Sequence, residues 1–293
     1  MKSALKAAFF GAVYMARKLA RPGGITILSY HSLDEHTTPL SVPPRLFEIH
    51  MATIAAERCP TFTMAQVAAH LATRRPFPPR AIAITFDDGF ENVASVAAPI
   101  MARYGLRGTV YVISGMVGRI TQWTDGEVEL PPMPLLTWAQ IKTLQAGGFE
   151  IGAHSVTHGF LTRCLQADLR RELRESKATL EGELGTQVTA FAYPQGDYDR
   201  RVVAETRLAG YTTATTVDQG RAGLNDDPLR LPRLLVSGNT TPAAMRAFTA
   251  PTIGPAYKLI NFAIKRVMGK KLWPRRRPGE VQSSHTLPGT ERV

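Results

Sequence analysis

The sequence has few cysteines, and the apolar run near its N-terminus is too short to cross a bilayer. Only Cys59 and Cys164 occur in its 293 residues, and their spacing matches neither a disulfide framework nor a metal site. The apolar run covers residues 7–16, whereas a spanning helix needs about 20 apolar residues. We therefore expect neither a disulfide-stabilised scaffold nor a helix that crosses a membrane at this run.

The middle of the chain also lacks an excess of basic charge. Of the formal net charge of +11, residues 1–24 contribute +5 and residues 255–293 contribute +7, so residues 25–254 carry −1. A neutral globular part argues against a nucleic-acid partner. Basic ends indicate contact with an anionic membrane surface, with solvated tails as the alternative.

The two basic ends have an amphipathic character. We interpret residues 1–24 as a basic amphipathic arm that lies on a membrane face, with a signal peptide as the alternative. In the tail, residues 251–293, apolar side chains recur at helical spacing from Tyr257 to Lys271, and a disordered stretch follows. These features predict a protein in the cytoplasm or peripheral at the inner face of a membrane, and an exported form stays open.

Between the ends, strand-like runs alternate with helical patterns. Alternation of this kind is typical of a parallel sheet in an α/β fold. The predicted helices cover residues 92–103, 138–146 and 168–184, and Gly185 follows the last as a stop signal. The predicted strands are Ile25–Tyr30, Ala81–Phe86, Gly108–Ile113, Phe149–Ser155, Val188–Tyr193, Tyr211–Thr216 and Arg233–Val236.

Seven strands with helices between them favour a closed barrel over an open sheet, although spacing alone leaves the open form available. We predict a single catalytic domain over residues 25–250, and we interpret residues 119–134 as a long loop over one face. In α/β barrels the working side chains gather where strands end. His31, Asp87, Asp88 and His154 all lie at or just after the end of a predicted strand, and so does the Pro194-Gln195-Gly196 segment.

The polar side chains at these strand ends suit a metal-assisted hydrolysis. His154 and His158 are four residues apart, so both imidazoles can reach one ion, and two histidines with one carboxylate leave positions open for water and substrate. Adjacent carboxylates on an extended segment point different ways. One of Asp87 and Asp88 can therefore bind metal while the other faces the water, and Gly89 permits the sharp turn.

At this point the chain resembles the polysaccharide deacetylases of carbohydrate esterase family four, the group with the NodB homology domain. The segments that carry the resemblance are Thr85-Phe86-Asp87-Asp88-Gly89, His154-Ser155-Val156-Thr157-His158 and Phe191-Ala192-Tyr193-Pro194-Gln195-Gly196. The resemblance implies a distorted (β/α)7 barrel that removes acetyl groups from N-acetylglucosamine units of polysaccharides or chitooligosaccharides.

Carried over by position, the resemblance also implies roles for single residues. Asp87 would be the general base, and the metal ligands would be Asp88, His154 and His158. The segment Tyr193-Pro194-Gln195-Gly196 would line the substrate groove, with the backbone N–H of Gln195 as a candidate oxyanion donor. Trp123, Trp138 and Tyr193 are candidates to stack on sugar rings, with a place in the core as the alternative for Trp138.

The chain departs from the family pattern in three places. Ala192 stands where the third segment has an arginine, no tryptophan follows close to Asp218, and the only histidine after His158 is His285, so the usual late acid is missing. Tyr30-His31 resembles a pair found in poly-N-acetylglucosamine deacetylases, which makes His31 the candidate acid, with a rim histidine as the alternative. Arg233 is grouped with the substrate-side residues and is expected to replace the missing arginine beside Asp87, with a structural salt bridge as the alternative.

One divalent metal ion is therefore expected, with Zn²⁺ favoured by the ligand set and Co²⁺ or Ni²⁺ as alternatives. The expected partner is a glycan that contains N-acetylglucosamine. Two other hypotheses stay open: a metal-dependent hydrolase of another amide or ester on the same fold, and a catalytically silent subunit that binds glycan at a membrane.

Overall fold

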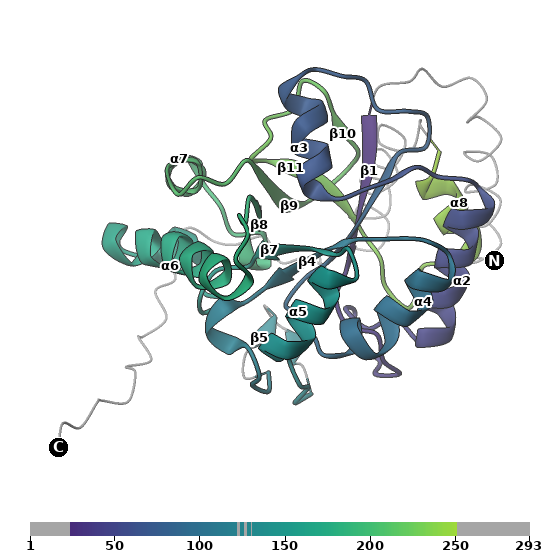
Figure 1. Cartoon of the computed structure of the whole chain (residues 1–293), viewed down its shortest axis with the longest axis horizontal. Helices are drawn as coiled ribbons and strands as arrows, with labels where there is room; N and C mark the ends of the chain where they lie inside the picture. Colours follow the sequence, from purple (N-terminus) through teal and green to yellow (C-terminus); the bar gives the residue numbers. More distant parts are fainter. Residues whose placement is uncertain (1–23, 122–123, 126–127, 130, 251–293) are drawn as a thin grey trace, which may run out of the picture. The chain divides into compact units, whose positions relative to one another are not determined.

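In a computed structural model of the chain, drawn in Figure 1, seven parallel strands close into a barrel. Each strand pairs with the next along the chain, and the first pairs with both β3 and the last, which closes the ring. The predicted (β/α)7 barrel is confirmed, and all seven predicted strands are present with small changes at their ends. They are β1 (Gly24–Tyr30), β3 (Ile82–Phe86), β4 (Thr109–Val112), β7 (Glu150–Ala153), β8 (Ala190–Ala192), β9 (Thr213–Gln219) and β11 (Leu231–Leu235).

The structure describes residues 24–121, 124–125, 128–129 and 131–250, which belong to one compact unit, Met1–Lys258. Residues 1–23 of the basic arm and the whole tail at 251–293 lie outside the described residues. The expected membrane contact of these ends and the choice between amphipathic arm and signal peptide therefore stay predictions. No helix in the described part of the chain is long and apolar enough to span a bilayer.

Helices cover the outside of the barrel, and one helix closes its amino-terminal end. The outer helices are α2 (Pro44–Ala56), α4 (Ala98–Arg103) with the π-helical turn Val93–Ala97 before it, α5 (Trp138–Ala146), α6 (Gln166–Leu184), α7 (Arg200–Leu208) and α8 (Pro242–Phe248). The closing helix is α3 (Met64–Ala72), whose Met64, Val67 and Leu71 pack with residues from inside the barrel. The three predicted helices are confirmed, and Gly185 ends α6 with a left-handed φ of 65°.

The distortion of the barrel lies between β9 and β11, where the chain forms no helix and only the short strand β10 (Ala222–Gly223). Neither β10 nor β2 (Thr61–Phe62), which extends the sheet beside β3, is apparent in the sequence pattern. Both have two residues, too few to show a hydrophobic alternation.

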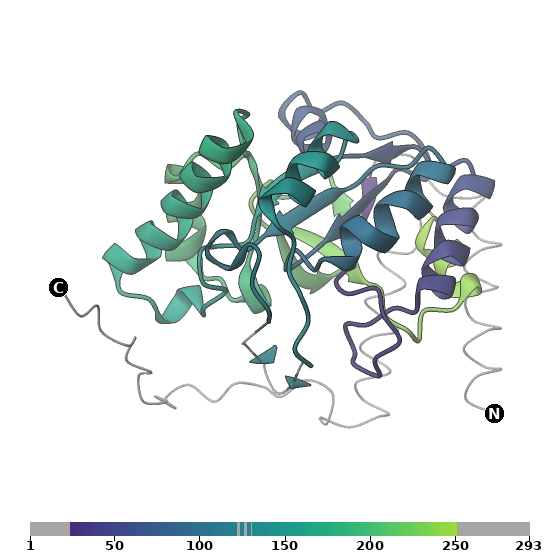
Figure 2. The same ribbon diagram turned by 60° about the horizontal axis from the view of Figure 1, so that its bottom comes forward.

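The long loop predicted at residues 119–134 is present and contains a small hairpin. Strands β5 (Thr124–Asp125) and β6 (Val128–Glu129) pair antiparallel, and an isolated bridge joins Ile120 to Pro134. In Figure 2 the two short arrows of β5 and β6 lie below the barrel strands. Trp123, one of the predicted sugar-stacking residues, lies outside the described residues, and Trp138 packs partly buried against the core.

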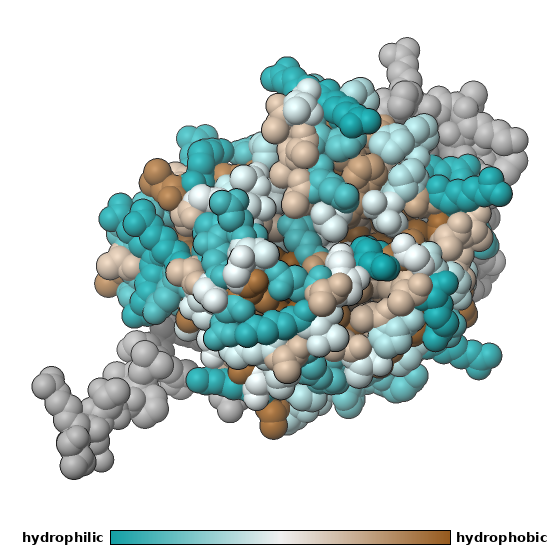
Figure 3. All heavy atoms as spheres, in the orientation of Figure 1, coloured by the Kyte–Doolittle hydropathy of each residue, from teal (hydrophilic) through white to brown (hydrophobic). Residues whose placement is uncertain are grey.

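The surface shows no single continuous apolar face in the view of Figure 3, where hydrophilic and apolar residues are interspersed. Four large apolar side chains are described as exposed, and they come from separate elements: Ile49, Ile120, Leu165 and Leu208. Scattered exposure of this kind is ordinary for a protein surface and indicates no binding site.

Candidate active site

Asp88, His154 and His158 converge at the carboxyl ends of β3 and β7. The Nε2 atoms of His154 and His158 lie 3.2 and 3.3 Å from Oδ1 of Asp88. Their candidate ligand atoms all lie within 4.8 Å of one another, and all three side chains are buried. Two segments that are far apart in the sequence thus place three metal-ligand atoms around one point, as predicted.

The backbone at two of these three residues is unusual, and this corrects one expectation. Asp88 does not continue an extended segment: its φ is 68°, and Gly89 follows with 72°. His158 is also left-handed, with a φ of 63°. The two carboxylates at Asp87 and Asp88 therefore point apart because the chain turns between them. Left-handed residues other than glycine are costly, and they concentrate at functional sites.

The orientation of His154 fits a metal site. Its Nδ1 donates a hydrogen bond of 2.8 Å to the carbonyl oxygen of Ala192, which leaves Nε2 to face Asp88. A ligand histidine in proteins is usually held by such a bond through its other ring nitrogen. The residues present therefore fit a divalent cation: two imidazole nitrogens and one carboxylate oxygen, with one imidazole already oriented by a carbonyl.

Electrostatics at these groups also favour a cation. Burial tends to raise the pKa of Asp88, but His158 and His154 outweigh it and hold that pKa well below its usual value. Burial tends to lower the pKa of His154, and the two neighbouring carboxylates outweigh it and raise that pKa. Asp88 is thus an anion in a buried place, where charge requires a compensating partner.

Asp87 lies beside this cluster in a two-pronged ion pair with Arg233. Nη1 and Nη2 of Arg233 each lie 2.6 Å from one oxygen of the Asp87 carboxylate, and both side chains are nearly inaccessible to solvent. Burial tends to raise the pKa of Asp87, but the charge and hydrogen bonds of Arg233 outweigh it and lower that pKa. The expectation that Arg233 lies beside Asp87 is confirmed. Its place among substrate-side residues is wrong, because Arg233 is 1% exposed.

Arg233 faces into the barrel because it lies two residues after Leu231 on β11, and Leu231 packs with the residues inside the barrel. On β11, Leu231 pairs with Thr215 of β9 and Arg233 pairs with Gln219, so the register shifts between the two. Pro232 lies at the shift, and a bulge is one of the few places within a sheet where proline occurs. Nε of Arg233 then donates to the carbonyl of Thr216 at 3.0 Å, which fixes the guanidinium.

His31 follows β1 on the side of Asp87. Its Nε2 lies 3.7 Å from Oδ2 of Asp87, and its side chain is 13% exposed. Its Nδ1 has no hydrogen-bond partner among the described residues. Asp87 therefore contacts a guanidinium on one side and faces an imidazole on the other, with the metal-ligand cluster next to it.

The third predicted segment follows β8 and is only partly as expected. Gln195 and Gly196 are partly exposed, and both have left-handed backbones, with φ of 54° and 63°. Tyr193 is 1% exposed: its hydroxyl donates to the carbonyl of Leu229, and its ring stacks on Tyr198. The prediction that the Tyr193 ring contacts a sugar is therefore wrong, because the strand end turns it into the core. Pro194 is buried as well.

Two buried carboxylates near the site were not apparent in the sequence. Asp197 accepts hydrogen bonds of 2.8 Å from the backbone N–H and from the hydroxyl of Thr162, which ties the Gln195 turn to the loop after His158. Glu172 of α6 binds the turn between His154 and His158. The only sequence signal for Glu172 is that it occupies a position in the apolar stripe of its helix.

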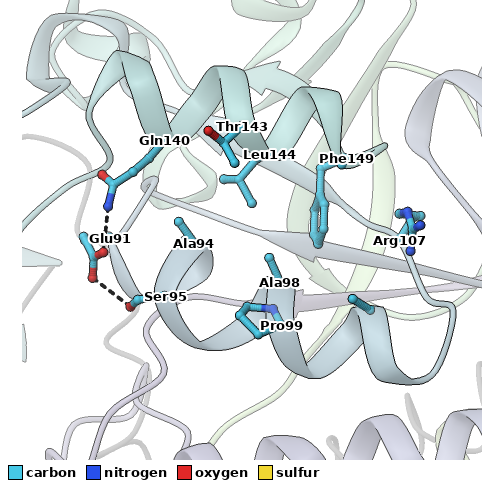
Figure 4. Close-up of a pocket in the computed structure, with 12 residues that line it drawn as sticks. Glu91, Ala94, Ser95, Ala98, Pro99, Arg107, Gln140, Thr143, Leu144 and Phe149 are labelled. Atoms are coloured by element: carbon cyan, nitrogen blue, oxygen red, sulfur yellow. Dashed lines mark hydrogen bonds between the residues drawn. The ribbon is translucent and has the colours of Figure 1, made fainter.

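A surface groove in the described part of the chain lies elsewhere, between α4 and α5. It encloses about 580 Å³ and is shown in Figure 4. Glu91 closes one end through hydrogen bonds with Gln140 and Ser95, and Arg107 lies at the other. None of the residues that line the groove is a candidate site residue, so the groove is separate from the chemistry described above.

Comparisons with known proteins agree with the fold, and a family match includes the segments of the candidate site. A family model described as "Polysaccharide deacetylase" matches residues 74–214, a range that contains both the Asp87-Asp88 segment and the His154–His158 segment. The Bacillus subtilis (strain 168) protein named "Putative polysaccharide deacetylase YxkH" is 26% identical over 231 residues, which cover 79% of this chain and 78% of that protein.

Two more distant relatives extend the comparison. The Staphylococcus aureus poly-beta-1,6-N-acetyl-D-glucosamine N-deacetylase is 23% identical over 170 residues, covering 55% of this chain and 56% of that enzyme. Among solved structures, the Streptococcus pyogenes deacetylase PplD in complex with acetate superposes with a TM-score of 0.70 and 24% identity. The match covers 79% of this chain and 100% of that one and shows the same barrel fold.

Proposed function

Because the chain belongs to the polysaccharide deacetylase family, and is thus a hydrolase, we propose that it is a metal-dependent N-deacetylase of N-acetylglucosamine-containing glycans. The observation that carries the proposal is the convergence of Asp88, His154 and His158 beside the Asp87–Arg233 pair. Three ligands leave positions open for water and substrate, which is the arrangement of a catalytic rather than a structural metal site.

Asp88, His154 and His158 would hold the ion, and the other residues would move protons. When bound, a divalent ion supplies Lewis-acid polarisation of the acetyl carbonyl and lowers the pKa of water. Zn²⁺ suits two imidazoles and a carboxylate, and Co²⁺ or Ni²⁺ also fit this set. Asp87 accepts the proton of the attacking water, since it is ionised and lies next to the ligand Asp88.

Two further groups complete the proposed reaction. The backbone N–H of Gln195, on a partly exposed turn after β8, donates to the oxyanion that forms as water adds to the acetyl carbon. His31 donates a proton to the leaving amine, from a position 3.7 Å from Asp87. Water and the acetamide are thereby converted into acetate and a free amine on the sugar.

The substrate class is proposed from the relatives. The name of the Staphylococcus aureus relative specifies poly-β-1,6-N-acetyl-D-glucosamine, and that relative is 23% identical to the present chain over 170 residues. We therefore favour a poly-N-acetylglucosamine over other acetylated glycans. The competing candidates are an O-acetyl ester substrate and a barrel that binds glycan without turning it over.

A substrate panel tests the proposal. Acetate release is measured on poly-β-1,6-N-acetylglucosamine, on chitooligosaccharides and on an O-acetylated xylan, with added Zn²⁺ or Co²⁺ and after chelation. We expect release from the N-acetylated glucosamine polymers only, and its loss on chelation. Release from the xylan alone would favour the ester hydrolase. Glycan binding without acetate from any substrate would favour the silent barrel.

A further inference from the structure

We infer that Glu172 is a positioning residue that holds the turn between His154 and His158 in its metal-binding conformation. Glu172 lies on α6 and touches neither imidazole in any described hydrogen bond, so it would act only through the backbone of the turn. The inference rests on the proposed metal-dependent function, because its purpose is to place two of the three proposed ligands.

Three hydrogen bonds join Glu172 to the turn. Oε2 accepts from the backbone N–H of Val156 at 2.9 Å and from that of Thr157 at 3.0 Å, and Oε1 accepts from the hydroxyl of Thr157 at 3.0 Å. Glu172 is buried, with 4% of its surface exposed. One carboxylate thus satisfies two successive backbone N–H groups that lie between the two histidines.

The turn needs such a partner because its backbone is strained. Ser155 and His158 both have left-handed φ values, 64° and 63°. Non-glycine residues keep this conformation only where the surroundings fix it. On the opposite side, the N–H groups of Ser114 and Gly115 bind the carbonyls of Ser155 and Val156, each at 3.1 Å. The turn is therefore held between the loop after β4 and the Glu172 carboxylate.

The position of Glu172 within α6 argues against a role in packing alone. The buried face of this helix consists of Leu169, Glu172, Leu173, Ser176 and Leu180. A carboxylate in an apolar stripe is costly unless it is hydrogen-bonded. Among the described residues Glu172 forms no ion pair with lysine or arginine. Its buried carboxylate therefore binds the turn between His154 and His158 and not a basic side chain. Bonds from N–H groups to an ionised acceptor are the stronger kind.

The test compares Glu172→Gln and Glu172→Ala with a matched control, Glu175→Gln. Glu175 lies one turn along the same helix, is 57% exposed and pairs only with Arg171 at 3.9 Å in the described contacts. Zn²⁺ affinity is measured by competition with a chelator, and kcat and KM on an N-acetylglucosamine oligomer. We expect Glu172→Ala to weaken metal affinity about 10-fold or more, as loss of an outer support does. Glu172→Gln should lose less, because its amide oxygen still accepts both N–H groups.

Further readouts separate positioning from folding. KM should change little in both variants, the control should match the wild type in every measurement, and amide exchange at Val156 and Thr157 should be faster in Glu172→Gln. If Glu172→Ala fails to fold, Glu172→Gln carries the test alone. Unchanged metal affinity and unchanged amide exchange in a folded variant would overturn the inference. If the wild-type protein binds no metal, the proposed function fails. Amide exchange then still tests whether Glu172 holds the turn: exchange at Val156 and Thr157 that is slow in the wild type and faster in Glu172→Gln supports this part of the inference.

Discussion

Replacing Arg233 by methionine should strongly destabilise the protein, and the loss should depend on pH. Methionine keeps an unbranched apolar side chain but removes the two bonds of 2.6 Å to Asp87 and the bond of 3.0 Å to Thr216. Asp87 would stay buried without its counter-charge. Removing one partner of a buried pair costs about 3–5 kcal/mol, a large part of the roughly 5–15 kcal/mol that holds a domain folded.

The pH dependence follows from the pKa of Asp87. In the wild type Arg233 holds this pKa below its ordinary value, so the pair contributes stability above that value and loses it as the pH falls through the folded-state pKa. Without Arg233, burial is the dominant influence and the folded-state pKa of Asp87 rises. The difference in unfolding free energy between variant and wild type should therefore be largest near neutral pH and should shrink towards acid pH.

Urea unfolding at neutral and mildly acidic pH measures this difference. The exposed pair of Arg103 with Glu48, at 2.6 Å, is the matched control, and Arg103→Met should cost no more than about 1 kcal/mol. Adding Asp87→Asn to Arg233→Met should recover part of the loss, since both charges are then gone. A loss below about 1 kcal/mol for Arg233→Met, or one that neither pH nor Asp87→Asn changes, would refute the reasoning.

Three further predictions concern single residues. His50 is buried between the Tyr30 hydroxyl and the Thr240 carbonyl, and burial lowers its pKa to about 4. The unfolding free energy, measured by urea unfolding, should therefore fall by about 3 kcal/mol as the pH is lowered from 6.5 to 4. The sign follows because only the unfolded state takes up the proton in that window, and His50→Gln should flatten this dependence. Gln195→Gly should stabilise the protein by about 1 kcal/mol in the same assay, because its φ is 54°, and acetate release should persist, because the backbone N–H stays. His31→Gln should lower kcat by about 10²- to 10⁴-fold in that release assay, and a smaller effect would contradict its role as the acid.

The barrel could be predicted because each of its strands is a short β-rich run bounded by turns, as in Ile82–Phe86, where all five residues are buried. The position of the site could be predicted for a related reason. The carboxyl ends of parallel strands lie on one face of a barrel, so the barrel fold brings Asp88 and His154 near each other. The resemblance to the family then indicated which of these residues would bind the metal and which would act as the base. Each of these inferences depends on local sequence and a regular fold.

What the sequence did not reveal depends on long-range contacts. Tyr193 was expected at the substrate side, but the end of β8 turns its ring inward onto Tyr198. The bulge in β9 opposite Arg233 arises from the register between β9 and β11, which no local pattern encodes. In the sequence Glu172 looks like any other charged residue of a helix. Only the structure shows that it accepts hydrogen bonds from N–H groups of the turn between His154 and His158.

The central claim is that Asp88, His154 and His158 hold a metal ion that the reaction requires. The measurement that tests it most directly is acetate release from an N-acetylglucosamine oligomer by chelator-treated protein while Zn²⁺ is titrated back. The account predicts that activity is absent after chelation, returns with one equivalent of metal per chain, and does not return in His154→Ala. Activity that persists without metal, or that returns equally in the variant, would contradict it.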